Sequence, residues 1–232
     1  MCIIAYYKKG KTPTLKALQY MMITNSDGAG IAWNDGKEAF YVKGIEKPAD
    51  AYNFIRELRR DPSVRDIVFH ARIATSGGVS GEKCHPFPLT DDPEALNAKE
   101  GSTSGAPLVF HNGVFRITPE KGLNDTQTYI KNILTPLYNT NPAAFDGGKF
   151  DPVINTTSDG SRVLLLYPDG VKFFGQWYSH EGIKYSNRNY YEKFNFYNGY
   201  YYRGCSYCND YHATRNELTK LYDDCDDREG WW

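Results

Sequence analysis

The sequence places a cysteine, Cys2, directly after the initiator methionine. If Met1 is removed, Cys2 becomes the first residue and carries a free α-amine, a group whose ordinary pKa is about 7.7–8.0. This amine can accept the proton of the Cys2 thiol, so that one residue supplies both nucleophile and general base. The plainer alternative is a buried cysteine on a first strand, because free cysteine is among the most buried residue types. Taken alone, Cys2 favours that alternative.

Two further segments end predicted strands with side chains that suit amide cleavage. His70–Thr75 places Arg72 where a strand enters a long loop, and a guanidinium binds a carboxylate through two parallel hydrogen bonds. The tripeptide His111-Asn112-Gly113 ends another strand. The Asn112 amide and the Gly113 backbone N–H are two donors that suit an oxyanion hole, and glycine allows close backbone approach.

Two other segments add a carboxylate and a turn. Asp125 lies at a predicted helix start, where it could hold a substrate ammonium, and Asn25–Gly30 forms a turn that enters a strand. Each of these features has a plainer interpretation: a surface ion pair for Arg72, a hairpin turn for Asn112-Gly113, a helix cap for Asp125. Considered one at a time, the plainer interpretation is favoured for every one of them.

Together and in this order, the segments resemble the class II glutamine amidotransferase domain of the N-terminal-nucleophile (Ntn) hydrolases, from Cys2 to about Asn189. The combination of Cys2, an H-x-R-x-A-T segment and H-N-G makes the resemblance specific. The remaining matches are Cys84–Phe87, Asn124–Thr126 and two that are weak alone, Asp27–Ile31 and Tyr185–Asn187.

The resemblance implies a four-layer αββα Ntn-hydrolase sandwich, in which two antiparallel sheets pack face to face between helical layers. It implies that Cys2 attacks the side-chain amide carbon of glutamine, forms a thioester and releases ammonia, with no cofactor required. It also implies the remaining roles, which are Asn112 and Gly113 in the oxyanion hole, Arg72 on the glutamine α-carboxylate, Asp125 on the α-ammonium, and Thr75 and His85 lining the pocket.

The sequence departs from the family at three places. Ile73 stands where glucosamine-synthase-type members commonly have an aromatic residue, Ser76-Gly77-Gly78 stands where some relatives have His-Gly, and Thr90–Ala106 is an insertion. These departures bear on the substrate more than on the amide chemistry.

Only about forty residues follow the matched region, too few for the synthase domain that normally consumes the ammonia. Three alternatives follow. A separate synthase partner receives the ammonia; or the chain hydrolyses glutamine, another γ-glutamyl amide or a small amide by itself; or it is an inactive binding or regulatory relative.

Short apolar segments rich in β-branched and aromatic residues predict the strands. The turn Pro168–Gly170 predicts that Arg162–Tyr167 pairs antiparallel with Val171–Phe174. The other predicted strands are Cys2–Tyr7, Gly30–Trp33, Ala39–Val42, Ile67–His70, Leu108–His111 and Ile183–Tyr185.

Helices are expected between these strands, which makes the fold class α+β. One is predicted from Thr12 as cap, with Pro13 first, to about Met22. A second runs from Pro48 to about Arg60. A third begins near Asn124 and should bend or end at Pro136. A fourth is predicted over Ala213–Tyr222, and Gly77–Pro107 is predicted to be a loop.

Length and charge limit the class of protein. The 232 residues predict one main domain, 1–191, followed by an aromatic, cysteine-containing tail, 192–232. The 27 Lys and Arg residues nearly cancel the 28 Asp and Glu residues, which argues against nucleic-acid binding driven by bulk charge. The absence of a signal peptide or long apolar run predicts a cytoplasmic chain without membrane contact.

The tail contains a second group of residues that could do chemistry. Cys205, Cys208, His212 and Cys225 supply four ligands of the kind that a structural zinc site uses. Their spacing is irregular for a zinc ribbon, so the alternative that these cysteines bind nothing and the tail aromatics pack on the main domain is favoured over zinc.

Overall fold

A computed structural model describes residues 2–73 and 80–190 of the chain, all within the compact unit Met1–Glu192. The unit is a mixed α+β structure with two antiparallel sheets. The predicted tail, 192–232, with its helix and its four metal-ligand candidates, lies outside the described residues.

The larger sheet has seven strands in the order β10-β11-β1-β4-β2-β3-β6, and every neighbouring pair is antiparallel. Strand β1 lies near its centre, so the segment that follows Cys2 is fully buried. The strands are β1 (Ile3–Tyr7), β2 (Ala29–Asn34), β3 (Ala39–Ile45), β4 (Ile67–Ala71), β6 (Glu100–Thr103), β10 (Tyr178–His180) and β11 (Ile183–Tyr185).

The smaller sheet has four strands in the order β5-β7-β8-β9. Its strands are β5 (Phe87–Pro88), β7 (Leu108–Asn112), β8 (Arg162–Leu166) and β9 (Val171–Phe174). The predicted antiparallel pairing of the last two strands is confirmed, with Leu166 opposite Val171. The turn residues Pro168–Gly170 therefore do form a hairpin.

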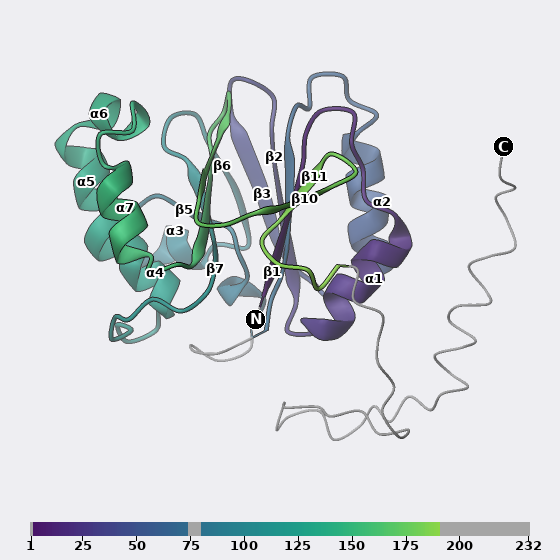
Figure 1. The fold of residues 1–232 in the computed structure, drawn as a ribbon, viewed down its shortest axis with the longest axis horizontal. Helices are drawn as coiled ribbons and strands as arrows, with labels where there is room; N and C mark the ends of the chain where they lie inside the picture. The colour runs from purple at the N-terminus through teal and green to yellow at the C-terminus, as the bar shows by residue number, and fades with distance from the viewer. Residues whose placement is uncertain (1, 74–79, 191–232) are drawn as a thin grey trace, which may run out of the picture. The chain divides into compact units, whose positions relative to one another are not determined.

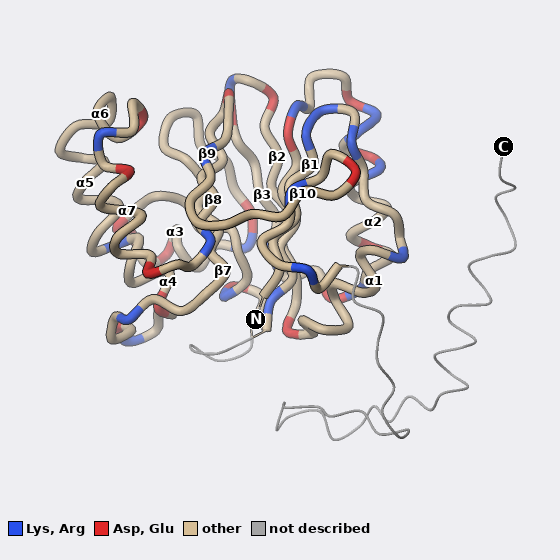
Figure 2. The backbone as a smooth tube through the Cα atoms, viewed as in Figure 1, with Lys and Arg blue, Asp and Glu red and all other residues tan. Residues whose placement is uncertain are grey.

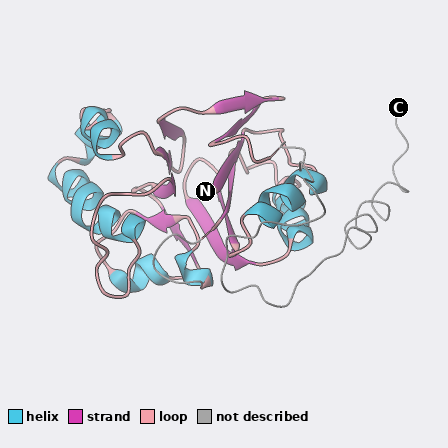
Figure 3. Ribbon diagram, turned by 60° about the horizontal axis from the view of Figure 1, so that its bottom comes forward, coloured by secondary structure: helices cyan, strands magenta, loops and turns pink. Residues whose placement is uncertain are grey.

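Three apolar clusters show how the layers are stacked (Figures 1 and 3). One cluster joins the two sheets, with Ile4 and Val68 of the larger sheet against Phe110 and Leu164 of the smaller one. The second cluster packs the other face of the larger sheet on the helices α1 (Leu15–Thr24) and α2 (Pro48–Leu58). The third packs the outer face of the smaller sheet on the remaining helices. The order is helix, sheet, sheet, helix.

Strand alternation decides which side chains lie between the sheets, because successive side chains point to opposite faces. Ile4 and Tyr6 of β1 face the smaller sheet, whereas Ile3, Ala5 and Tyr7 pack on the helical side. Cys2 is in phase with Ile4. By the same period, Asn112 is in phase with Phe110 of β7, so both candidate residues belong to the space between the sheets.

The first helix begins later than predicted. Thr14, and not Thr12, is its cap, and the Thr14 hydroxyl accepts a hydrogen bond from the Ala17 N–H at 3.1 Å. Thr14 is the second threonine of a Thr-Pro-Thr segment. Its hydroxyl reaches the N–H of Ala17, three residues later, as the side chain of an N-cap residue does. The second predicted helix is confirmed as α2, with Pro48 in its first turn.

The prediction that Gly77–Pro107 is a loop is wrong for its described part. It contains a 3₁₀ turn (Gly81–Lys83), β5, α3 (Pro93–Asn97) and β6. Asp92 caps α3 by accepting from the Glu94 N–H, and β6 pairs with β3 at the sheet edge. These elements are too short for a periodic pattern, and β6 is polar because it is an exposed edge strand.

The third predicted helix begins as expected but continues past Pro136. It consists of α4 (Asp125–Tyr129), a π-type turn (Ile130–Leu134) and α5 (Thr135–Thr140). Pro136 is the second residue of α5, and the wider turn before it accommodates the missing N–H. Two short helices follow that the sequence did not reveal, α6 (Pro142–Asp146) and α7 (Asp151–Thr157), each with a proline in its first turn.

Charged residues of both signs are scattered over the loops and helices of the described unit (Figure 2). Within residues 2–73 and 80–190, no helix has the length and apolar character needed to cross a membrane.

Candidate active site

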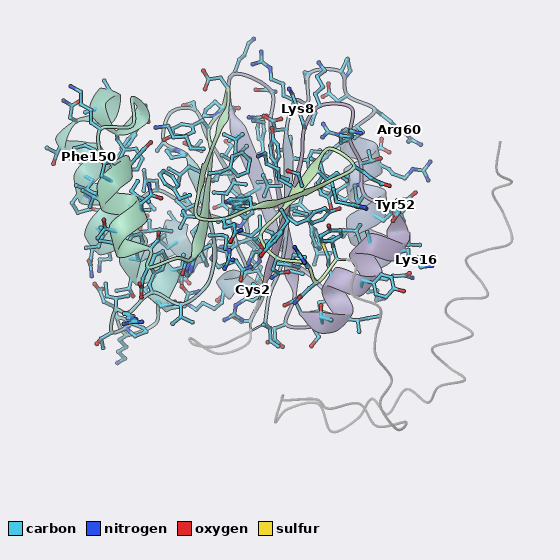
Figure 4. The ribbon with its side chains drawn as sticks, in the orientation of Figure 1. Cys2, Lys8, Lys16, Tyr52, Arg60 and Phe150 are labelled. Atoms are coloured by element: carbon cyan, nitrogen blue, oxygen red, sulfur yellow. The ribbon has the colours of Figure 1, made fainter. Side chains whose placement is uncertain are left out.

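Cys2 lies at the start of the central strand β1, between the two helical groups of Figure 4, and is half-buried. Its Sγ atom is 3.4 Å from the Ile73 backbone oxygen and 3.4 Å from the Ile73 backbone nitrogen. The Asn187 side-chain amide donates to the Cys2 carbonyl oxygen at 2.6 Å. Residues that follow the neighbouring strands β4 and β11 therefore hold both the side chain and the backbone of Cys2.

The pKa of the Cys2 thiol is raised above its ordinary value, chiefly because burial penalises the thiolate. The Ile73 backbone hydrogen bond and the nearby Arg72 charge act in the opposite direction, with smaller effect. A thiol in this environment needs a base to become a nucleophile at neutral pH.

Asn112 ends β7 with its side chain buried and directed toward the larger sheet. Its Nδ2 donates to the Ser186 hydroxyl oxygen at 2.7 Å, and the same oxygen accepts from the Ile4 N–H at 2.8 Å. The Ser186 N–H in turn donates to the Ile4 carbonyl oxygen at 2.9 Å. The Ser186 hydroxyl therefore links the Asn112 amide, the candidate oxyanion-hole donor, by hydrogen bonds to the strand that follows Cys2.

Gly113 follows at a place where no side chain fits. A β-carbon there would overlap the Oγ and Cβ atoms of Ser161. Two residues later, the Phe115 N–H donates to Asp125 Oδ2 at 3.0 Å. Close packing and this hydrogen bond hold the segment after Asn112 in one conformation, as an oxyanion hole requires.

Arg72 follows strand β4 and is 4% exposed. Its backbone joins the turn before β2, because its N–H donates to the Gly28 oxygen and its carbonyl accepts from the Asp27 N–H. Burial raises the pKa of both thiols, Cys2 and Cys84, and the Arg72 charge partly opposes that increase. The guanidinium therefore acts electrostatically on the candidate nucleophile.

Asp125 opens α4, as predicted, and is 8% exposed. The cap before it is a capping box, in which Asn124 accepts from the Gln127 N–H and Gln127 accepts from the Asn124 N–H. The next residue, Thr126, bonds His111 Nδ1 at 2.9 Å. Through these contacts the start of α4 is attached to the end of β7, beside the Asn112-Gly113 pair.

His85 is enclosed by other rings. Its ring centroid lies 4.3 Å from that of His70, 6.4 Å from that of His111 and 4.7 Å from that of Phe87, and His85 is 5% exposed. Burial lowers the pKa of all three histidines, to about 3 for His70 and about 4 for His111. All three rings are neutral at pH 7, and His85 lies inside the sandwich rather than on an open surface.

The glycines of Asn25–Gly30 allow this enclosure. A β-carbon on Gly30 would overlap the His85 carbonyl oxygen, and one on Gly28 would lie 3.0 Å from Cys84 Sγ. Gly28 also has a φ of +99°, which only glycine adopts readily. The Asp27–Gly30 turn, which is a weak motif alone, is therefore the surface on which the Cys84-His85 segment packs.

The structure thus brings together Cys2, the backbone beside Arg72 and, through Ser186, Asn112. It adds three residues that the sequence did not assign to the site: Ser161, Ser186 and Asn187. The Tyr185-Ser186-Asn187 match was the available signal for two of them, whereas Ser161 had none. Thr75 lies outside the described residues, as do Cys205, Cys208, His212 and Cys225.

The residues around Cys2 were also considered as a metal site and as part of a surface depression. Among residues 2–73 and 80–190, no group of three or more His, Cys, Asp or Glu residues could hold a metal ion. A depression of about 560 Å³ lies instead beside the turn at Gly36 and the β8–β9 hairpin at Asp169. Neither Cys2 nor Asn112 lines it.

The sequence was also compared with known proteins. No protein-family model matches the chain, and no curated protein matches it.

Proposed function

We propose that this chain is a Cys-dependent amide hydrolase of the class II glutamine amidotransferase type, and that its helix-sheet-sheet-helix unit is an Ntn-hydrolase fold. One observation carries the proposal. Asn112, which is 110 positions from Cys2 in the sequence, is linked by a single hydroxyl to the strand that follows Cys2, because Ser186 Oγ bonds both Asn112 Nδ2 and the N–H of Ile4, two residues after Cys2. This pairing of a nucleophile with an amide donor is what cleavage of an amide requires.

The first half of the reaction forms a thioester. After loss of Met1, the Cys2 α-amine takes the thiol proton and Sγ attacks the side-chain amide carbon of glutamine. The amide oxygen becomes an oxyanion that accepts hydrogen bonds from Asn112 Nδ2 and the Gly113 N–H. The ammonium then protonates the leaving nitrogen, the C–N bond breaks and ammonia departs.

The second half regenerates the enzyme. The Cys2 amine takes a proton from water, whose oxygen attacks the thioester carbon through a second oxyanion at the same donors. The C–S bond breaks, the sulfur recovers its proton and glutamate leaves. Ammonia released in the first half is free to pass to a separate synthase partner.

Two charged residues suit the two ends of free glutamine. Arg72 provides a guanidinium beside Cys2, which suits the α-carboxylate. Asp125 provides a carboxylate attached to the loop after Gly113, which suits the α-ammonium. One cation whose charge acts on the Cys2 thiol and one anion bonded to the segment after Gly113 suit a small zwitterionic substrate.

The test is ammonia and glutamate release from glutamine by protein whose intact mass shows that it begins at Cys2. We expect turnover by this protein and none by Cys2→Ala. The matched control is Cys84→Ala, which removes the other described thiol, a fully buried one, and should leave turnover measurable.

Other outcomes separate the alternatives. Turnover of another γ-glutamyl amide or a small amide, but not of glutamine, would retain the mechanism and change the substrate. A folded protein that begins at Cys2, hydrolyses no amide and is not alkylated at Cys2 by a glutamine-analogue diazo-ketone would overturn the enzyme proposal in favour of a binding or regulatory relative.

A further inference from the structure

We infer that Ser186 is a positioning residue that sets the Asn112 amide relative to Cys2; the inference rests on the proposed function. Ser186 follows β11 and is fully buried. Its side chain bonds Asn112 and the backbone of Ile4, and none of the contacts described above joins it to the Cys2 thiol. Its effect on the reaction would pass through Asn112.

The hydrogen bonds of Ser186 identify what it holds. Its oxygen accepts two of them, from the Ile4 N–H at 2.8 Å and from Asn112 Nδ2 at 2.7 Å. Two acceptor positions are all that a hydroxyl oxygen offers, so both are used. The Ser186 backbone also donates to the Ile4 carbonyl, which fixes the serine on the strand of the nucleophile.

This arrangement determines which way the Asn112 amide points. A carboxamide has two N–H donors, and the bond to Ser186 uses one of them. Asn112 Oδ1 has no hydrogen-bond partner among the described residues, so the bond through Nδ2 is what orients the group. Without the serine oxygen the amide can rotate, which exchanges its donor and acceptor ends and places an oxygen where the oxyanion forms.

The same oxygen connects the two sheets. Ile4 belongs to the seven-stranded sheet and Asn112 to the four-stranded sheet. Ser186 therefore fixes the spacing between nucleophile and oxyanion donor in a way that neither sheet does alone. A buried serine with a merely structural role would alter stability and every reaction of Cys2 to a similar degree.

The experiment compares Ser186→Ala with Ser158→Ala in two reactions. Ser158 is also buried, and its hydroxyl bonds the Asn155 carbonyl at the end of α7. Glutamine hydrolysis forms an oxyanion, whereas alkylation of Cys2 by iodoacetamide displaces iodide and forms none. Alkylation is followed on the N-terminal peptide by mass spectrometry.

We expect Ser186→Ala to lower kcat for glutamine on the order of tenfold, the effect of one lost orienting hydrogen bond, with KM changed less than about twofold. Its alkylation rate should stay within about twofold of wild type, and Ser158→Ala should change neither reaction. In the Asn112→Ala background, removal of Ser186 should have no further effect on kcat, because the group it orients is gone.

Three results would overturn the inference: an unchanged kcat in Ser186→Ala, an equal loss in both reactions, or full additivity with Asn112→Ala. If the wild-type protein that begins at Cys2 hydrolyses no amide, the proposed function fails and the positioning claim is decided by crystallography. An Asn112 amide with the same orientation in wild-type and Ser186→Ala crystals would then overturn it, and a rotated amide would support it.

Discussion

The Cys2 Sγ atom lies 3.4 Å from both the nitrogen and the oxygen of the Ile73 backbone. A protonated thiol satisfies both groups, because its S–H donates to the oxygen while its sulfur accepts from the N–H. A thiolate keeps only the second contact and faces the carbonyl oxygen. The Ile73 N–H contact on its own lowers the pKa of Cys2, but burial outweighs it, so the pKa of the thiol is raised and the protonated form is favoured.

The pH dependence of Cys2 alkylation follows from that raised pKa. Since the reactive species is the thiolate, the rate should still increase about tenfold per pH unit through pH 8 and should not level off before pH 9. The measurement is the iodoacetamide rate on the N-terminal peptide from pH 6 to pH 10. A plateau below pH 8 would show an activated thiolate and contradict the prediction.

Substitution of Asn112 tests the oxyanion hole directly. We expect Asn112→Ala to lower kcat for glutamine about 10²–10³-fold, as loss of a single oxyanion donor does elsewhere, with a much smaller change in KM. The control is Asn132→Ala, which removes a surface amide that bonds Glu120. A loss of less than fivefold in Asn112→Ala would remove this residue from the mechanism.

Substitution of Gly113 tests close packing. Gly113→Ala places a methyl group against the Ser161 side chain, so we expect loss of turnover and a lower melting temperature. Gly170→Ala is the matched control, because its β-carbon would meet nothing within 4 Å. The double variant Gly113→Ala, Ser161→Gly relieves the overlap and should recover part of the melting temperature. If it recovers none, the cause of the loss is not this contact.

The buried histidines predict acid sensitivity. The pKa values of His70 and His111 are about 3 and about 4 in the folded protein, below the ordinary value of about 6.5 in an unfolded chain. As the pH falls below 6.5, the unfolded chain binds these protons first. Stability is therefore complete above pH 6.5 and is lost as the pH approaches the folded-state values.

At pH 5 the loss amounts to about 2 kcal/mol for each of these histidines, relative to pH 8. Urea unfolding at the two pH values measures it. His70→Leu should reduce the loss by about a third, because His85 and His111 still contribute, whereas His180→Gln, which changes an exposed histidine, should leave it as in wild type. An equal pH dependence in His70→Leu and wild type would contradict the assignment.

Sequence patterns were sufficient for most regular elements. Strands such as Ile67–His70 and helices such as Pro48–Arg60 carry their own periodicity, turn residues and caps, so their places agree with β4 and α2 within a few residues. Patterns failed where an element is too short to have a period, as in α3, or where it lies exposed at a sheet edge, as in β6. For the site, the motifs named Cys2 and Asn112 but not the hydrogen bonds through Ser186 that link Asn112 to the strand after Cys2.

The sequence by itself determined the residue types available for chemistry and, through strand alternation, the face on which Cys2 and Asn112 lie. Only the tertiary structure decided that the two faces meet, that Ser186 stands between Ile4 and Asn112, and that Ser161 excludes any side chain at position 113. The reason is physical. Alternation is a property of one strand, whereas the pairing register and the packing of two sheets depend on contacts between segments that are far apart in the sequence, such as Asn112 and Ser186 or Ile4 and Ser186.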